Sequence, residues 1–296
     1  MILLAGGSGR LGTQVVRLLA ARGFGLRILT RDPARAQHLA GEHVELVVGD
    51  VRDPHAAERA LAGARTVIAA MHGFAGNGDC NPRTVDGQGN RNLLYAAQAA
   101  GVEHVILISV QGATPKHPME LFRMKHQAEQ ELRASGLAWA IIRPTAYMET
   151  WGALIGEPLL TTGQTRIFGR GVNPINFVSA HDVARFVELA VVEPGMRGAL
   201  IEVGGPANLS LTQVAETFET VTGKTGSKRH VPLPMMRVLA QLMRPVNPTL
   251  ARQIQAGVVM DTRDMTFDAS ETGRRYPMVT PTSFAEVVRR DYGASA

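Results

Sequence analysis

The stretch Met1-Ile2-Leu3-Leu4-Ala5-Gly6-Gly7-Ser8-Gly9-Arg10-Leu11-Gly12 decides the fold of this chain. Its apolar start suits a buried strand, and its glycines lead into a segment, 11–19, whose apolar residues recur on one helical face. Glycine suits such a turn because the backbone needs unusual dihedrals and must come close to a pyrophosphate. The unpaired N–H groups at the helix N-terminus then receive the anion. A glycine motif alone also occurs in ordinary turns, but between a strand and a helix it predicts dinucleotide binding.

Length and composition set the bounds for the fold class. A chain of 296 residues with 45% hydrophobic content is long enough for one large α/β domain, or for such a domain with a smaller lobe. The single cysteine, Cys80, excludes an internal disulfide and a metal site made of thiolates, so we expect no metal and a reducing, cytoplasmic compartment. The N-terminus has no basic region before a long apolar core, so we expect no signal peptide.

Charge and hydropathy narrow the range of partners. No segment reaches the ~20 uninterrupted apolar residues of a membrane-spanning helix, so no membrane span is expected. The net charge of +5 is spread along the chain without a dense Lys/Arg block. We therefore expect a small-molecule substrate and no nucleic acid, in a monomer or a homodimer.

The first half of the chain alternates strand-like and helix-like segments. The strand-like segments after the opening stretch are 26–29, 44–48, 66–70, 105–108 and 139–142. Helix starts are marked by a capping residue before proline, as at Asp32-Pro33, Asp53-Pro54 and Asn81-Pro82. Strands and helices at this spacing predict an α/β fold with a Rossmann-type, doubly wound parallel sheet. Ligands of such sheets bind beyond the carboxyl ends of the strands.

The end of the second strand bears on the choice of dinucleotide. An acidic residue there would bind the ribose hydroxyls of NAD, whereas an arginine pairs with the 2′-phosphate of NADP. Asp32 has the spacing of the NAD acid, but capping before Pro33 also explains it. We favour NADP, with NAD left open, and take Arg31 as the main phosphate ligand and Arg10 and Arg35 as helpers. The alternative for each arginine is an exposed surface charge.

The other strand ends supply further candidate ligands of the cofactor. Asp50 and Val51 follow the third strand, where the carboxylate would reach the adenine edge unless it only supports a turn. Ala69 and Ala70 end the fourth strand and offer small side chains beside the ribose. The nicotinamide end is expected near the residues after the fifth and sixth strands, Ser109, Pro144 and Thr145.

The predicted helix 118–134 carries the most informative residue for catalysis. Lys125 falls on the same face as the apolar residues Leu121 and Ala128. A buried lysine is costly unless a partner satisfies its charge, and the ribose hydroxyls of a cofactor would do so. The alternative is a lysine at the margin of the apolar face whose stem extends towards water.

Together these segments resemble a known family. They are the glycine turn 6–12, Thr30-Arg31-Asp32-Pro33, Gly49-Asp50-Val51, the run 85–94 (VDGQGNRNLL), Ser109, Lys125 and the run 143–149 (RPTAYME). Over about residues 1–190 the chain resembles an atypical short-chain dehydrogenase/reductase, nearest to the NmrA-like and isoflavone-reductase-like branch. The resemblance implies a single NAD(P)-binding domain over residues 1–296, with a small substrate lobe formed mainly by about 150–175 and 205–280.

The family's active-site pattern is Tyr-x-x-x-Lys, and it is only half present. Lys125 matches the lysine, but Leu121 stands in the place of the tyrosine and can transfer no proton. Tyr147, after the sixth strand, is therefore a candidate on the substrate side. Three histidines are weaker candidates for a proton donor, with His126 expected to face water. They are His72, His117 and His126.

From these features we expect an NADP-dependent oxidoreductase that passes a hydride to a small organic acceptor, such as a quinone or a conjugated carbonyl. Lys125, Ser109 and Tyr147 are its candidate catalytic residues. An acceptor of this kind tolerates a missing acid, since its reduced anion is stabilised by conjugation. The alternatives are a non-catalytic sensor of NADP(H), and a scaffold subunit that retains a bound nucleotide.

The second half of the chain gives weaker signals. Ser179 and Asp182 have the spacing of a capping box before a helix, which makes Asp182 structural first. Strands are expected at 176–178 and 200–203, and helices at 210–221 and within 281–292. The segment 232–260 is rich in Met, Leu, Pro and Arg, and its methionines fill a core or line a pocket or lid.

Overall fold

The computed structural model describes residues 1–293 and divides them into two compact units. The first consists of Met1–Arg143 and Val183–Glu202, and the second of Pro144–Asp182 and the chain from Val203 onward. The described residues contain no helix that is both long and apolar enough to cross a membrane.

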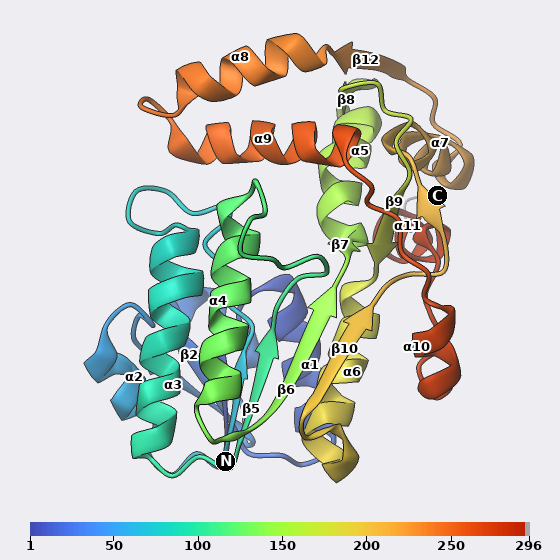
Figure 1. The fold of residues 1–296 in the computed structure, drawn as a ribbon. Helices are drawn as coiled ribbons and strands as arrows, with labels where there is room; N and C mark the ends of the chain where they lie inside the picture. Colours follow the sequence, from blue (N-terminus) through green and yellow to red (C-terminus); the bar gives the residue numbers. More distant parts are fainter. Residues whose placement is uncertain (294–296) are drawn as a thin grey trace. The chain divides into compact units, whose positions relative to one another are not determined.

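A seven-stranded sheet forms the centre of the first unit (Figure 1). Its strands are β1 (Ile2–Ala5), β2 (Leu26–Thr30), β3 (Val44–Val48), β4 (Thr66–Ala69), β5 (His104–Ile108), β6 (Ala138–Pro144) and β10 (Ala199–Val203). Their order is β10-β6-β5-β4-β1-β2-β3, and the pairs from β3 to β6 are parallel. The strand order reverses between β1 and β4, which is where ligands of such sheets bind.

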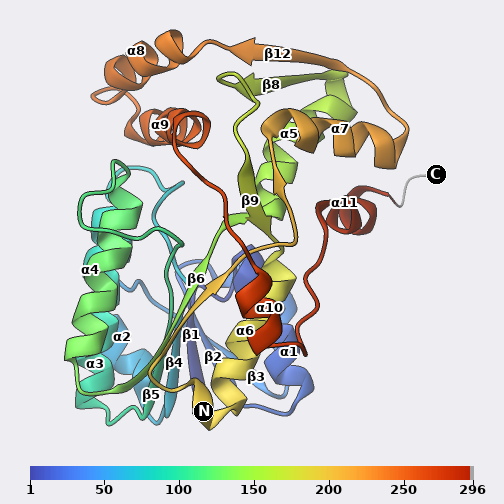
Figure 2. The same ribbon diagram turned by 45° about the vertical axis from the view of Figure 1, so that its right-hand side comes forward.

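Helices cover both faces of this sheet, as Figure 2 shows. One face carries α2 (Pro54–Leu61), α3 (Asn90–Ala99) and α4 (Glu120–Ala134), and the other carries α1 (Arg10–Ala21) and α6 (Ala180–Val192). All four residues of β1 are buried, as expected for a strand covered on both faces. The main core of the unit joins apolar residues of β1, β4 and β5 to those of α2, α3 and α4.

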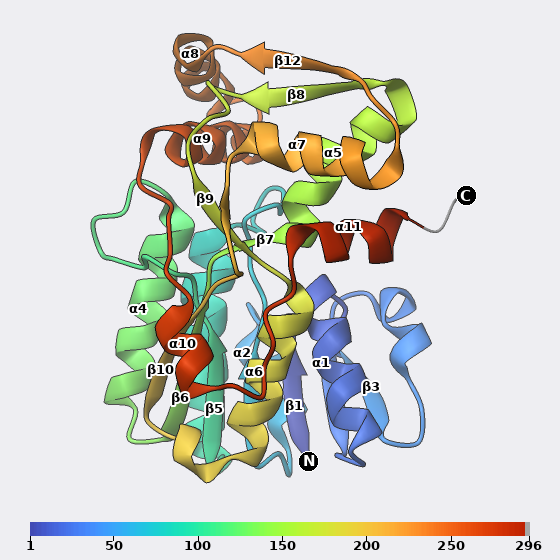
Figure 3. The ribbon, with the colours of Figure 1, turned by 90° about the vertical axis from the view of Figure 1, so that its right-hand side faces the viewer.

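The second unit has smaller sheets and more helices (Figure 3). Its strands are β7 (Ala146–Tyr147), β8 (Gln164–Phe168), β9 (Ile175–Val178), β11 (Asn208–Leu209) and β12 (Ser227–Val231). Its helices are α5 (Met148–Thr162), α7 (Leu211–Thr222), α8 (Leu233–Met243), α9 (Pro248–Thr262), α10 (Ser270–Arg275) and α11 (Phe284–Tyr292). The fully buried rings of Phe177 and Phe218 pack with Phe284 at the centre of its core.

The predicted strands of the first half agree with the structure to within one or two residues, and the final helix is present as α11. The structure differs from the sequence-based expectation at three places. Asp32 caps only a 3₁₀ turn, Pro33–Arg35, where the doubly wound pattern predicts a crossover helix. Residues Arg83–Gly89, before α3, form a π-helical turn that was not expected. The Asp182 carboxylate accepts hydrogen bonds from the backbone and hydroxyl of Thr282 instead of closing a capping box, although its structural role is confirmed.

Candidate functional site

The glycine turn after β1 is held tightly against the chain's own backbone. Gly6 has a φ of +94°, and a Cβ atom there would lie 2.7 Å from the carbonyl carbon of Ala70, directly after β4. A Cβ atom at Gly12 would lie 2.6 Å from the Cα atom of Gly7. Internal packing therefore requires glycine at positions 6 and 12, and it brings the turn next to the reversal point between β1 and β4.

Gly9 is different, because the chain constrains it less tightly than Gly6 and Gly12. Its φ of −82° and ψ of 171° suit any residue, and an added Cβ atom would meet only the Gly6 oxygen, at 3.3 Å. Gly9 is the N-cap of α1, with no side-chain cap and no acidic residue in the first turn. The uncapped helix N-terminus fits an anion that comes close to the backbone, as a pyrophosphate does.

Beyond β2 and β3, two arginines surround one carboxylate. Arg52 makes a bidentate ion pair with Asp50, with Nη2 2.6 Å and Nε 3.0 Å from Oδ2. Arg31 Nη1 lies 4.0 Å from the same Oδ2 atom and 3.1 Å from the sulfur of Cys80. Burial raises the pKa of Asp50, but the hydrogen bonds and charge of Arg52, with the charge of Arg31, outweigh it and leave the pKa below its usual value. The cluster keeps an excess positive charge at an exposed position.

The other residues predicted to bind the adenine and 2′-phosphate end of the cofactor have different surroundings. The Asp32 carboxylate accepts the N–H of Ala34 at 3.1 Å, so capping occupies one of its oxygens. Arg10 and Arg35 are exposed. The Val51 carbonyl accepts a 2.9 Å hydrogen bond from the side chain of Asn92, which fixes the loop after β3.

Lys125 is buried, as predicted, but the chain itself satisfies its charge. Its Nζ atom lies 3.0 Å from Asp86 Oδ1 and donates to the carbonyl of Met71 at 3.0 Å. The other oxygen of Asp86 accepts the N–H of Gly73 at 2.8 Å. The pair thus ties α4 and the π-helical turn to the loop after β4. The burial of Lys125 alone does not demand a cofactor, because Asp86 explains it.

Ser109, at the end of β5, belongs to a second buried network. Its hydroxyl donates to Glu129 Oε1, and Glu129 receives Arg143 Nε at 2.8 Å and Nη2 at 2.6 Å. Arg143 also lies 3.3 Å from Glu202. These carboxylates, Glu129 first, hold the pKa of Arg143 above its usual value. Glu129 is one turn after Lys125 on α4, so both networks lie along one side of that helix.

The remaining predicted residues belong to the second unit. Pro144 ends β6, and the hydroxyl of Thr145 donates to Asn176 Oδ1 at 2.9 Å. The hydroxyl of Tyr147 is buried and has no hydrogen-bond partner among residues 1–293. Burial, with a contribution from the Glu149 charge, raises the pKa of this phenol well above its usual value, so it stays protonated.

The three candidate histidines differ in burial and in hydrogen-bond partners. The ring of His117 stacks on Phe122 with centroids 3.9 Å apart, and its Nδ1 accepts the N–H of Met119. His126, which was expected to face water, is half-buried, and its Nδ1 atom has no hydrogen-bond partner within the described part of the chain. His72, in the loop after β4, is solvent-exposed. Residues 1–293 hold no cluster of three His, Cys, Asp or Glu that would bind a metal.

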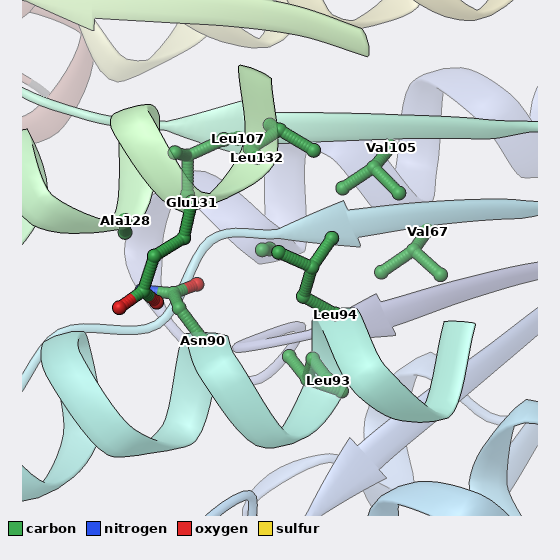
Figure 4. A pocket seen from close by; sticks show the side chains of 10 residues that line it. Val67, Asn90, Leu93, Leu94, Val105, Leu107, Ala128, Glu131 and Leu132 are labelled. Atoms are coloured by element: carbon green, nitrogen blue, oxygen red, sulfur yellow. The ribbon is translucent and has the colours of Figure 1, made fainter. Parts of the chain in front are cut away.

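A small cavity between the sheet and helices α3 and α4 is distinct from this site (Figure 4). It has a volume of about 20 Å³, enough for a single water molecule. Apolar side chains such as Leu93 and Leu94 line it, and the polar groups of Asn90 and Glu131 lie together at one end. It is a gap in the packing and too small for a substrate.

Three residues of these networks were not predicted from the sequence. Asp86 lies inside the quoted run 85–94, and Arg52 comes directly after Gly49-Asp50-Val51. Glu129 lies one turn beyond Lys125. The predicted burial of Lys125 could have indicated Asp86, because a buried ammonium group needs a buried acid on a neighbouring segment.

Comparison with known proteins places this site in a family. A family model described as NAD(P)H-binding matches residues 6–194. The chain belongs to the NAD(P)H-binding family. The match begins in the glycine turn and includes the clusters around Asp50 and Lys125. It confirms the NAD(P)H-binding core that the resemblance to atypical short-chain dehydrogenases implied.

Relatives of this NAD(P)H-binding protein carry different names. It is 29% identical over 225 residues to an NAD(P)H azoreductase of Xenophilus azovorans, covering 76% of this chain and 74% of that protein. It is 26% identical over 246 residues to the photosystem II assembly factor Ycf39 of a Synechocystis strain, covering 82% and 74%. An NADPH-dependent quinone oxidoreductase of Escherichia coli, solved with NADPH, aligns over 98% of this chain and 99% of its own with a TM-score of 0.79 and 23% identity, which confirms the fold.

Proposed function

We propose that this protein is an NADPH-dependent oxidoreductase that reduces a small organic acceptor, such as a quinone or a conjugated carbonyl. The observation that carries the proposal is the N-terminus of α1 behind Gly9, which has no side-chain cap and no acidic residue in its first turn. The names of two similar proteins, an NAD(P)H azoreductase and a quinone oxidoreductase, support an acceptor that is a conjugated molecule. Bound NADPH would supply the hydride.

The exposed cluster after β2 and β3 supports NADP over NAD. Arg31 is 55% exposed at its side chain, and Arg52 neutralises Asp50, so the cluster offers a guanidinium to the dianionic 2′-phosphate. The acid that would bind NAD, Asp32, already caps a turn. We propose Arg31 as the main phosphate ligand, assisted by Arg10 and Arg35.

Lys125 is proposed to hold the nicotinamide ribose. An ammonium group has three N–H donors, and among the described residues one of them donates to the Met71 carbonyl while Asp86 balances the charge as an ion pair. A remaining N–H donor would bind a ribose hydroxyl. Ser109 would act as a positioning residue, since its hydroxyl orients Glu129, which lies on α4 with Lys125.

Tyr147 is proposed as the proton donor in place of the missing tyrosine. Its hydroxyl has no hydrogen-bond partner among residues 1–293, so the O–H is free to donate. The second unit, through about 150–175 and 205–280, would select the acceptor, and Ala69, Ala70, Val51, Pro144 and Thr145 would line the cofactor.

Oxidation of NADPH in the presence of a panel of quinones, azo compounds and conjugated carbonyls tests the proposal. We expect turnover with at least one conjugated acceptor, and a loss of kcat with little change in NADPH affinity for Tyr147→Phe. Tight NADPH binding without oxidation by any acceptor would contradict the enzyme and favour the second candidate.

That second candidate is a non-catalytic protein that senses NADP(H). Leu121 favours it, because the usual proton donor of the family is absent, and so does the similarity to a protein named as an assembly factor. Its signature is a change in conformation or partner between NADPH and NADP without turnover. Limited proteolysis with each nucleotide distinguishes the two candidates.

A further inference from the structure

Helix α8 in the second unit has two apolar faces, and only one of them is covered. Met236 and Ala240 are buried and pack with Ile254 of α9. The opposite side carries Met235, Val238, Leu239 and Leu242, at the i, i+3, i+4, i+7 spacing of a single helical stripe, and Val246 continues it. Their exposed fractions are 51%, 57%, 36%, 62% and 76% in this order.

This exposure is concentrated in one place. With Leu250, six of the large hydrophobic residues that are exposed within residues 1–293 lie between positions 235 and 250. Scattered exposed hydrophobics are ordinary, but a continuous stripe on one helix marks a surface that meets an apolar partner.

The surrounding charge indicates what that partner is. Between Glu219 and Asp261 the sequence has no acidic residue, but it has six Lys or Arg residues. Arg237 and Arg244 are exposed on α8 and at its end, and Lys224 and Arg229 are exposed just before it, while Lys228 pairs with Glu219. A second copy docked face to face would bring like charges together, so a dimer through this face is disfavoured.

We propose that the outer face of α8 docks on the surface of an anionic phospholipid bilayer. The stripe from Met235 to Val246 would enter the boundary between headgroups and acyl chains, and the long side chains of Arg237 and Arg244, on the polar side of α8, would reach lipid phosphates. An amphipathic helix with a cationic polar face lies in the plane of the membrane in this way without spanning it. The proposal does not depend on the proposed oxidoreductase function.

Flotation of the full-length protein with vesicles tests the proposal. Vesicles of phosphatidylcholine with about 30% phosphatidylglycerol should bind the protein, and pure phosphatidylcholine vesicles should bind it at least tenfold less. Two variants should each lower binding at least tenfold: Val238→Glu/Leu242→Glu for the stripe and Arg237→Glu/Arg244→Glu for the charges. Val172→Glu, at a residue of the second unit that is 64% exposed, is the matched control and should bind as the wild type does.

Several outcomes would overturn the proposal. The proposal is wrong if the protein binds neither kind of vesicle or binds both equally. It is also wrong if both double variants bind the anionic vesicles as the wild type does. A concentration-dependent dimer that Val238→Glu/Leu242→Glu abolishes would assign the face to a second copy instead. Urea unfolding of each variant separates a lost surface from a lost fold, and the two double variants probe the face independently.

Discussion

Two ion-pair clusters of the first unit use the same kinds of groups in opposite settings. Lys125 and Asp86 have side chains that are 5% and 0% exposed, and both Asp86 oxygens are engaged inside the protein. Arg31, Asp50 and Arg52 have side chains that are 55%, 23% and 31% exposed. Breaking a buried pair leaves a desolvated charge, whereas an exposed pair contributes little to stability. The first cluster therefore builds the site, and the second is free to meet a ligand.

The largest expected effect is on stability, from breaking the buried pair. Lys125→Met leaves the Asp86 carboxylate buried without its cation, so the free energy of unfolding should fall by about 3–5 kcal/mol. Urea unfolding measures the loss. The double variant Lys125→Met/Asp86→Leu removes both charges and should recover much of the stability. A change below about 1 kcal/mol in the single variant would contradict the structural role of the pair.

A substitution in the exposed cluster should lower NADPH affinity and leave the stability of the fold almost unchanged. Arg31→Ala removes one charge-assisted contact to the 2′-phosphate, which is worth ~1.5–3 kcal/mol, so the Kd for NADPH should rise roughly 10- to 100-fold. The Kd for NADH should stay within about twofold, and the free energy of unfolding within about 0.5 kcal/mol. Calorimetric titration with both nucleotides tests this. An equal loss for NADPH and NADH would remove the phosphate assignment.

The smallest effect is the pH dependence of the exposed cluster. The pKa of Asp50 is lowered in the folded state, so the carboxylate stabilises the fold above its unfolded pKa, near 3.8, and this contribution is lost as the pH falls through the folded pKa. The stability difference between the wild type and Asp50→Asn should therefore shrink between about pH 5 and about pH 3. Urea midpoints across that range measure it. A difference that grows towards acid would have the wrong sign.

The sequence could predict the sheet and the burial of Lys125, but not the partner of that lysine. Regular alternation predicted the sheet and most of its helices, and local periodicity predicted that Lys125 is buried. Its partner could not be found in the same way, because Asp86 lies 39 residues earlier and reaches the lysine through an irregular π-helical turn. The bond between Asp182 and Thr282 spans 100 residues and was missed for the same reason.

The segment 232–260 illustrates a second limit of sequence analysis. Its methionines fit either a core or a pocket, and the structure divides them, since Met236 is buried while Met235 is 51% exposed. A helix that is apolar on both sides has no single amphipathic pattern, so periodicity cannot say which face is covered.

The most direct test of the account is NADPH binding by Gly9→Ser. The backbone at Gly9 already has N-cap geometry, so a serine hydroxyl can accept an amide N–H of α1 and offset the 3.3 Å contact of the new Cβ atom with the Gly6 oxygen, and the free energy of unfolding should stay within about 1 kcal/mol of the wild type. The same hydroxyl would occupy the place of the pyrophosphate, so we predict that calorimetry gives a Kd at least about tenfold higher than that of the wild type. Unchanged affinity in a folded variant would mean that the cofactor does not bind at the N-terminus of α1.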